Sequence, residues 1–129
     1  MKDKVGLLLV SHSERLALGT HELISAMARD VPIRIAAGDG EGGLGTRAEA
    51  IEEAVPSEWE HVLLLFDMGS ARMNAEMAAE MLTARGCGVT IIDAPFVEGA
   101  LTAAMAIQVG KTPSEAVKEA EATRRSKMN

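Results

Sequence analysis

Four short apolar runs, each followed by a segment of helical character, constrain the fold of this chain more than any other feature. The runs cover residues 5–10, 33–37, 62–66 and 89–92. Continuous apolar runs of this length are typical of parallel strands, because helices cover both faces of a parallel sheet. Strand–helix units repeated along a chain are joined by right-handed crossovers. The pattern predicts an α/β fold: a three-layer α/β/α sandwich with a mainly parallel four-stranded sheet and the first strand inside it.

The helices are predicted from apolar spacing and from capping residues. Residues 13–29 have helical periodicity, with one side formed by Leu16, Thr20, Leu23, Ile24 and Met27. Three further helices are expected to begin at hydroxyl side chains that can accept a first-turn N–H: Thr46 (with Glu49), Ser70, and Thr112 (with Pro113 and Glu115). Another helix is expected over residues 97–109. On the helix after Ser70, Met73, Met77 and Met81 recur every fourth residue, so we expect them to face the core rather than a dimer surface.

Length, charge and cysteine usage narrow the functional classes. A chain of 129 residues is expected to form one domain, residues 1–129. The net charge of −6 argues against a nucleic-acid partner and against an anionic membrane surface. Cys87 is the only cysteine, which excludes an internal disulfide and is typical of a cytoplasmic protein. The apolar run at residues 5–10 is too short for a signal-peptide core or a membrane span.

The candidate site lies where the strands end, because ligands of open α/β sheets bind beyond the carboxyl ends of the strands. The first strand is followed by Ser11-His12-Ser13, and His12 is the only histidine in the four segments that follow strands. Asp67 follows the third strand. We expect Asp67 to hold one ring nitrogen of His12, which fixes the tautomer and leaves the other nitrogen free as a nucleophile. A histidine at a strand end is equally often structural, and Asp67 alone also fits a turn or cap residue.

A glycine-rich loop, residues 38–45, follows the second strand. Its backbone N–H groups, together with the positive ends of helices beginning near Ser13, Thr46 and Ser70, favour an anion such as a phosphoryl group at this edge. The simpler interpretation is a flexible loop, and its acidic residues Asp39 and Glu41 repel an anion unless they point outward. The loop is not a P-loop, because Thr46 stands where that motif needs lysine.

The remaining chemistry-bearing residues are expected to be incidental. His21 lies within the first helix, and His61 precedes the third strand at the opposite edge of the sheet. A strand separates the two edges by roughly 17–20 Å, so His12 and His61 cannot share a metal ion. Cys87 precedes the fourth strand and is expected to be a small core residue.

The segment Val10-Ser11-His12-Ser13, the loop residues Gly38-Asp39-Gly40 with Gly45-Thr46, and the stretch from Phe66 to Asn74 carry a resemblance. They resemble the phosphotransfer subunit of bacterial dihydroxyacetone kinase, which is similar to the mannose-class enzyme IIA domain of the sugar phosphotransferase system. The resemblance covers nearly the whole chain. Its most specific part is Asp67-Met68-Gly69-Ser70-Ala71-Arg72-Met73-Asn74.

This resemblance implies a mannose-class enzyme IIA-like fold and a phosphohistidine carrier. His12 would be phosphorylated at Nε2 by the histidine phosphocarrier protein, which is charged ultimately from phosphoenolpyruvate, and Asp67 would hold Nδ1. The phosphoryl group would pass to ADP in a partner nucleotide-binding subunit, while a third subunit holds dihydroxyacetone. The subunit would be a homodimer with no metal or cofactor of its own. Some family members continue into fused phosphocarrier modules, so the donor of this chain is expected to be a separate protein.

Six residues around the predicted site are expected to stabilise the phosphoryl group: Ser13, Gly40, Gly45, Thr46, Gly69 and Ser70. Two other functions stay open. A chelatase-like or metal-binding domain would use His12 as a ligand, but it needs further ligands at the same edge, where only carboxylates are found. A non-catalytic regulatory or dimerisation module on the same fold would require the pairing of His12 with Asp67 to be accidental.

Overall fold

Strands and helices alternate along the computed structural model, which describes residues 4–126. Within these residues the elements are β1 (Val5–Ser11), α1 (Glu14–Met27), β2 (Ile33–Ala37), α2 (Ala48–Glu53), β3 (His61–Phe66), α3 (Gly69–Ala84), β4 (Gly88–Ile92), α4 (Phe96–Gln108) and α5 (Pro113–Ser126). Each predicted strand is present, with bounds within one residue of those expected. No helix among the described residues is long and apolar enough to cross a membrane.

The sheet is parallel throughout, with strand order β2-β1-β3-β4. The first strand therefore lies inside the sheet, as predicted. In the register, Val10 stands opposite Ala36 of β2 and Phe66 of β3. The residues that follow these three positions consequently meet at one edge, and this brings the segments around His12 and Asp67 together.

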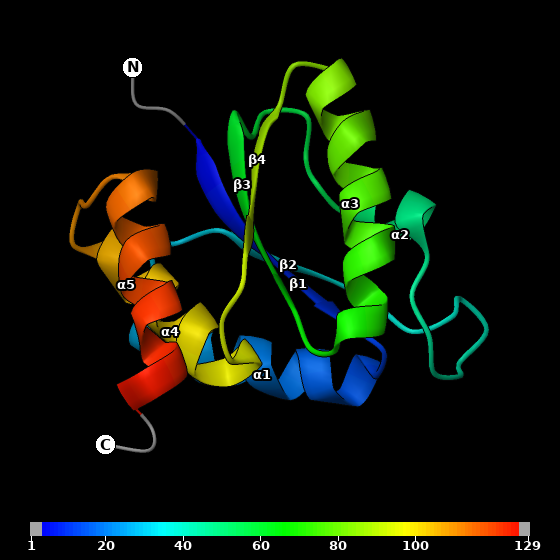
Figure 1. Ribbon diagram of the computed structural model, residues 1–129, viewed down its shortest axis with the longest axis horizontal. Helices are drawn as coiled ribbons and strands as arrows, with labels where there is room; N and C mark the ends of the chain where they lie inside the picture. Colours follow the sequence, from blue (N-terminus) through cyan, green and yellow to red (C-terminus); the bar gives the residue numbers. More distant parts are fainter. Residues whose placement is uncertain (1–3, 127–129) are drawn as a thin grey trace.

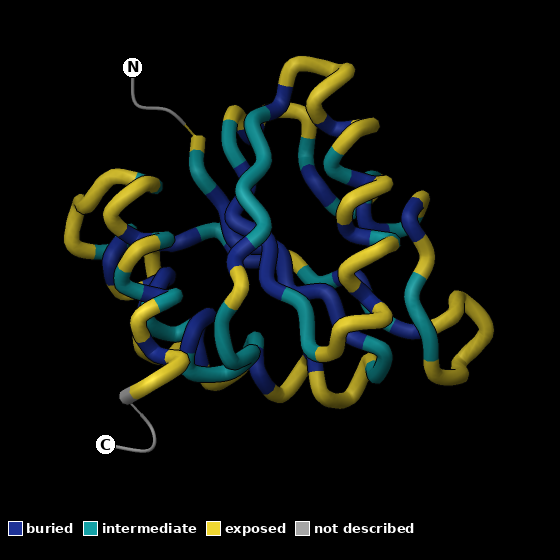
Figure 2. Tube along the Cα trace, in the orientation of Figure 1, coloured by how far each residue is buried: buried dark blue, intermediate teal, exposed yellow. Residues whose placement is uncertain are grey.

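Helices cover both faces of the sheet and complete the predicted three layers (Figure 1). Alternate β1 side chains serve opposite faces: Leu7 and Leu9 pack in the cluster with α1, α4 and α5, and Leu8 and Val10 pack in the cluster with α2 and α3. Figure 2 shows the resulting pattern, with buried residues along the strands and exposed residues on the outer surfaces of the helices and on the loops.

Of the three predicted helix caps, that of Thr112 is present, and those of Thr46 and Ser70 are wrong; α1 has a cap at Ser13. The Ser13 hydroxyl accepts the Leu16 N–H at the start of α1, and Thr112 and Glu115 form the reciprocal capping box of α5. However, α2 follows Arg47 and α3 follows Met68, and neither of these N-cap residues makes a side-chain cap. The hydroxyls of Thr46 and Ser70 make other bonds, described below, because both belong to the site at the sheet edge.

The expectation that the methionines of α3 lie in the core is also wrong. Met73, Met77 and Met81 are 71%, 52% and 38% exposed. The helix instead turns small residues and one leucine toward the sheet: Ala71, Ala75, Ala78 and Leu82. Alanines let a helix backbone approach the strands closely, and this face leaves the larger methionines outside.

The predicted buried face of α1 is partly wrong for the same reason, because a small residue again takes a position next to the sheet. Of the residues expected on its inner side, Thr20 and Ile24 are buried, whereas Leu16, Leu23 and Met27 are exposed. Ala17 occupies the buried position instead. Apolar spacing alone does not separate an alanine-lined inner face from a neighbouring leucine stripe.

Candidate functional site

His12 lies directly after β1, with its side chain 19% exposed. Its Nδ1 is 2.9 Å from Oδ1 of Asp67, the first residue after β3. An ionised carboxylate only accepts hydrogen bonds, so Nδ1 must carry the proton of this contact. In the neutral ring Nε2 then holds the lone pair, which is the state needed for a nucleophile. The pairing of ring and carboxylate expected from the sequence is present.

Asp67 is held by hydrogen bonds on both carboxylate oxygens, and its side chain is only 8% exposed. Oδ1 accepts the Met68 N–H at 2.7 Å in addition to the His12 ring, and Oδ2 accepts the His12 N–H and the Ser11 hydroxyl, each at 2.9 Å. Burial by itself raises the pKa of Asp67, but the bonds from the His12 backbone, the His12 ring, Ser11 and Met68 outweigh burial. The pKa of Asp67 therefore lies below its ordinary value of 3.8, and the group is a fixed anion at neutral pH.

The other ring nitrogen faces the first turn of α3. The Ser70 hydroxyl lies 2.7 Å from Nε2 of His12 and can donate to its lone pair. Ser70 follows Gly69, the first residue of this 16-residue helix. The first N–H groups of a helix have no partner within it and carry the positive end of the helix dipole. Nε2 thus sits where added negative charge is favoured.

Ser11 also belongs to the site, although its role was missed from the sequence. It ends β1 and is fully buried, and its hydroxyl contacts Oδ2 of Asp67 and accepts the N–H of Ser13. The available signal was a serine at the end of a strand that is otherwise apolar. A buried hydroxyl in such a strand needs hydrogen-bond partners, which points to a polar neighbour.

The glycine-rich loop holds the backbone around His12. The N–H of Gly45 donates to the carbonyl of His12 at 2.9 Å, and the N–H of Gly38 donates to the carbonyl of Ser11 at 3.2 Å. Inside the loop, Asp39 Oδ1 accepts the N–H groups of Glu41 and Gly43. These two bonds keep the pKa of Asp39 below its ordinary value. Several N–H groups that the sequence suggested for an anion are therefore bonded within the protein.

Asn74 joins the end of this loop to α3. Its side-chain amide donates to the hydroxyl of Thr46 at 2.7 Å and to the Thr46 carbonyl at 3.2 Å. Asn74 was not among the predicted site residues, although it closes the most specific sequence stretch. Thr46 lies next to Gly45, so these bonds tie the His12 backbone, the loop and α3 into one connected unit.

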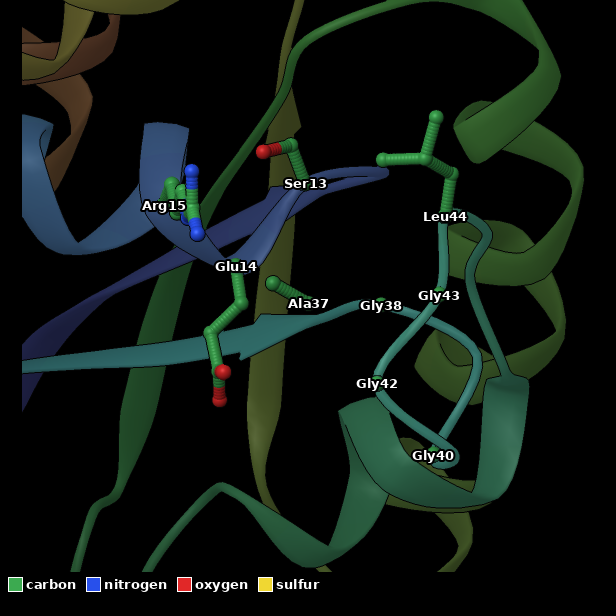
Figure 3. A pocket seen from close by; sticks show the side chains of 9 residues that line it. All are labelled: Ser13, Glu14, Arg15, Ala37, Gly38, Gly40, Gly42, Gly43 and Leu44. Carbon is green, nitrogen blue, oxygen red and sulfur yellow. The ribbon is translucent and has the colours of Figure 1, made fainter.

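A hollow of about 620 Å³ opens beside the imidazole rather than at it. His12 is not part of its lining, which consists of Ser13, Glu14, Arg15, Ala37, Gly38, Gly40, Gly42, Gly43 and Leu44 (Figure 3). Gly40 lines this hollow and has φ +88°, and its Cα faces the side chain of Arg47. Gly40 is exposed and lies at the end of the loop away from Ser13 (Figure 3).

The structure therefore separates the predicted residues into two groups. Asp67, Ser70 and Gly45 bond His12 directly. Ser13 follows His12 in the chain, Gly69 precedes Ser70 at the start of α3, and Thr46 follows Gly45 and is bonded by Asn74. Gly40 stands apart from this group.

The other two histidines lie elsewhere. His21 contacts the carbonyl of Ile33, and His61 contacts the Thr90 hydroxyl at 2.9 Å at the start of β3. Burial lowers the pKa of His61, which favours its neutral form. Cys87 is buried, as predicted, and burial raises the pKa of its thiol. Across residues 4–126, no group of three or more His, Cys, Asp or Glu side chains is placed to hold a metal ion.

One family model matches residues 6–117 of the chain: EIIA-man, described as the fructose IIA component of the PTS system. The chain belongs to this family. The matched residues run from the second residue of β1 into α5, and they contain His12, the glycine-rich loop and Asp67.

Curated relatives support the same assignment. The phosphoryl donor subunit DhaM of PEP-dependent dihydroxyacetone kinase 1 from Listeria innocua is 35% identical over 114 residues, which cover 88% of this chain and 90% of the relative. The phosphotransferase subunit DhaM of the PTS-dependent dihydroxyacetone kinase from Lactococcus lactis is 36% identical, with the same two coverages. DhaM from Escherichia coli is 41% identical, but the match covers only 24% of that longer protein.

Two solved structures share the fold. The crystal structure of EF1359, a protein of unknown function, has a TM-score of 0.79 at 30% identity, over 94% of this chain and 95% of that one. A sigma-54 interaction domain protein from Enterococcus faecalis has a TM-score of 0.71 over 99% of this chain and 96% of that one. Its identity is 15%, so this likeness concerns the fold alone.

Proposed function

We propose that this chain is the phosphoryl donor subunit of a phosphoenolpyruvate-dependent dihydroxyacetone kinase, with His12 as the phosphorylated residue. The observation that carries the proposal is the geometry of the imidazole: Nδ1 is fixed by a buried carboxylate at 2.9 Å, and Nε2 faces a partly exposed helix start. The relatives named DhaM, at 35–43% identity, support dihydroxyacetone as the final acceptor.

In the first step, the lone pair of Nε2 attacks the phosphorus of a phosphohistidine on the histidine phosphocarrier protein. The Nε2–P bond forms as the N–P bond of the donor breaks, and the donor imidazole recovers its lone pair. With both nitrogens substituted, the ring of His12 gains positive charge, which the Asp67 carboxylate stabilises through Nδ1–H. Ser70 and the N–H groups at the start of α3 are the proposed donors to the phosphoryl oxygens.

In the second step, a terminal phosphate oxygen of ADP attacks the phosphorus, in a partner nucleotide-binding subunit. The Nε2–P bond breaks, its electron pair returns to Nε2, and ATP forms for transfer to dihydroxyacetone in a third subunit. Phosphoryl transfer depends on positioning and charge stabilisation more than on covalent chemistry by the protein. A site held rigidly on the Nδ1 side and open on the Nε2 side supports both steps.

The proposed function also implies a location, an oligomeric state and a cofactor content for the protein. We propose a cytoplasmic homodimer that receives the phosphoryl group from the histidine phosphocarrier protein and carries no metal or cofactor of its own. Light scattering of the purified protein tests the homodimer, because the mass expected for a dimer is twice the chain mass of 13.6 kDa. A mass that stays at the monomer value over the accessible concentration range would contradict that part of the proposal.

The function is tested by intact-protein mass spectrometry after incubation with phosphoenolpyruvate, enzyme I and the histidine phosphocarrier protein. The wild type is expected to gain one acid-labile phosphoryl group, and His12→Ala none. His21→Ala is the matched control, because His21 lies in α1 and contacts the Ile33 carbonyl instead of the site. Addition of the nucleotide-binding and dihydroxyacetone-binding subunits with ADP is then expected to remove the group.

Each failure is informative. If the phosphocarrier is charged but the wild type gains no mass, the relay proposal is wrong for this donor. If the His12→Ala variant is still phosphorylated, another residue is the carrier. If the phosphorylated protein does not lose its group to the kinase subunits, the phosphoryl acceptor differs from the one proposed.

A further inference from the structure

The hydroxyl of Ser11 makes contacts that the two-step transfer does not by itself require. We propose that Ser11 is a positioning residue: its hydroxyl holds Oδ2 of Asp67 so that Oδ1 stays aligned with Nδ1 of His12. This inference rests on the proposed phosphoryl transfer for its biological meaning. The positioning role itself, in which Ser11 controls the ring tautomer of His12 through Asp67, can be tested in the unphosphorylated protein.

The contacts of Ser11 assign its single hydroxyl proton. Oγ lies 2.9 Å from Oδ2 of Asp67 and 3.0 Å from the carbonyl of Ser13, and it accepts the Ser13 N–H at 3.0 Å. A hydroxyl has one proton to donate, and a bond to an ionised acceptor is stronger than a bond to a neutral carbonyl. The proton therefore goes to Asp67, while the oxygen lone pairs hold the turn that carries His12.

The carboxylate of Asp67 needs hydrogen bonds to fix its orientation, because rotation about its terminal side-chain torsion costs little energy. The terminal torsion of an aspartate side chain has a broad distribution, so hydrogen bonds decide the orientation of the carboxylate. Without Ser11, Oδ2 keeps only the bond from the N–H of His12, while Oδ1 keeps its contacts with Met68 and the ring, so the carboxylate is oriented by three bonds instead of four. Rotation of the carboxylate then moves Oδ1 away from Nδ1 and weakens the preference for the Nδ1–H tautomer.

The location of Ser11 argues against a role in the fold alone. Ser11 is fully buried at the end of β1, opposite Ala37 of β2. The preceding residues from Leu7 to Val10 are apolar and fully buried, so a valine at position 11 would continue the pattern of the strand. A hydroxyl in this place is costly unless it is bonded, and its partner here is the carboxylate that contacts the ring.

The experiment compares Ser11→Ala with wild type by NMR of the His12 ring nitrogens in the unphosphorylated protein. Wild type is expected to show the Nδ1–H tautomer, and Ser11→Ala a measurable population of the Nε2–H form. An NMR titration of the Asp67 carboxyl carbon is expected to show a higher pKa in the variant, because one bond that lowers it is lost. The phosphorylation rate is expected to fall roughly three- to tenfold, less than for the loss of a hydrogen bond made directly to the reacting ring, because Ser11 acts on His12 only through Asp67.

Two further variants separate positioning from stability. Ser11→Thr keeps the hydroxyl and is expected to restore the tautomer and the rate. Thr20→Val removes another buried hydroxyl, which bonds only the Leu16 carbonyl within α1, and is expected to leave the His12 ring unchanged. Should Ser11→Ala not fold, Ser11→Cys takes its place, because a thiol is a much weaker donor of similar size.

The proposal is overturned if the Ser11 variant loses stability while the ring tautomer and the Asp67 titration stay as in wild type. The two NMR measurements need no phosphoryl donor. A wild type that cannot be phosphorylated would therefore refute the proposed function and leave the positioning role to be decided by the ring nitrogens.

Discussion

Replacing Asp67 by asparagine tests the site most directly, because the amide has nearly the shape of the carboxylate but different hydrogen-bonding capacity. The carboxylate accepts four bonds: from the His12 ring, the Met68 N–H, the His12 N–H and the Ser11 hydroxyl. An amide can accept only at its oxygen, and its NH₂ donates. Whichever way the introduced amide is oriented, its NH₂ must face one of two backbone N–H groups.

The two orientations have different consequences for His12. If the amide oxygen faces Nδ1, the NH₂ opposes the His12 N–H, while Ser11 can turn its proton to the Ser13 carbonyl. If the NH₂ faces Nδ1, it opposes the Met68 N–H, and the ring is driven to the Nε2–H tautomer, which has no lone pair on the nucleophile. Both orientations remove the charge that stabilises the phosphorylated ring.

The magnitude follows from these losses. A hydrogen bond to a charged group contributes about 1.5–3 kcal/mol, so the phosphorylation rate is expected to fall roughly 10- to 150-fold. The N–H of His12 is partly buried and that of Met68 is exposed, so leaving either one unsatisfied is expected to lower the free energy of unfolding by about 1 kcal/mol, the lower end of the cost for a buried group. The rate is measured by quenched-flow labelling with the charged phosphocarrier, and the stability by urea unfolding. Asp30→Asn is the control, because Asp30 pairs with Gln108 far from the site.

The pH dependence supplies an independent check. The pKa of Asp67 in the folded state lies below its ordinary value of 3.8, so its contribution to stability is fully present above that value and is lost as the pH falls through the lower folded pKa. The stability difference between wild type and Asp67→Asn is therefore expected to be largest near neutral pH and to narrow in acid. A variant phosphorylated at the wild-type rate, or a stability difference independent of pH, would refute the reasoning.

Further predictions concern packing and the loop. Gly6→Ala is expected to lower the free energy of unfolding by about 1–3 kcal/mol, because the added Cβ overlaps the buried ring of Trp59. Gly19→Ala in α1 has open space and is expected to stabilise by roughly 0.5–1 kcal/mol; equal urea midpoints for both variants would contradict the packing. Asn74→Ala is expected to slow phosphorylation by freeing Thr46 and to reduce loop protection in hydrogen exchange; unchanged protection would contradict the anchoring role.

The sheet could be predicted because its signal is local and strong. Four apolar runs with intervening helical segments allow few topologies, because strands that alternate with helices form a parallel sheet and their crossovers are right-handed. The position of His12 and Asp67 at one edge then follows from strand order, since Val10 and Phe66 stand opposite each other in the register. The start of α5 was also predictable, because Thr112 and Glu115 have the spacing of a helix capping box.

What the sequence could not reveal is how each polar or apolar side chain is used. Thr46 and Ser70 have the residue type of helix caps, but Asn74 and His12 compete for their hydroxyls across 28 and 58 residues. Such long-range partners leave no trace in local spacing. Met73 fits an apolar stripe as well as Ala71 does, and only the close approach of helix and sheet decides that alanine is inside.

The two sides of the imidazole differ in a way that suits a carrier. Nδ1 faces a carboxylate with an 8% exposed side chain, held by bonds from three residues, so ring orientation and tautomer are settled before any partner arrives. Nε2 contacts one exposed hydroxyl, that of Ser70. Turning this hydroxyl away from Nε2 breaks one neutral hydrogen bond, which costs about 1 kcal/mol. A cost of this size slows the attack of Nε2 on phosphorus only a little. The same hydroxyl lies close enough to Nε2 to donate a hydrogen bond to an incoming phosphoryl oxygen. This combination supports the proposed carrier role, because the fixed Nδ1–H makes Nε2 ready as a nucleophile and the single contact from Ser70 leaves Nε2 open to a phosphoryl group.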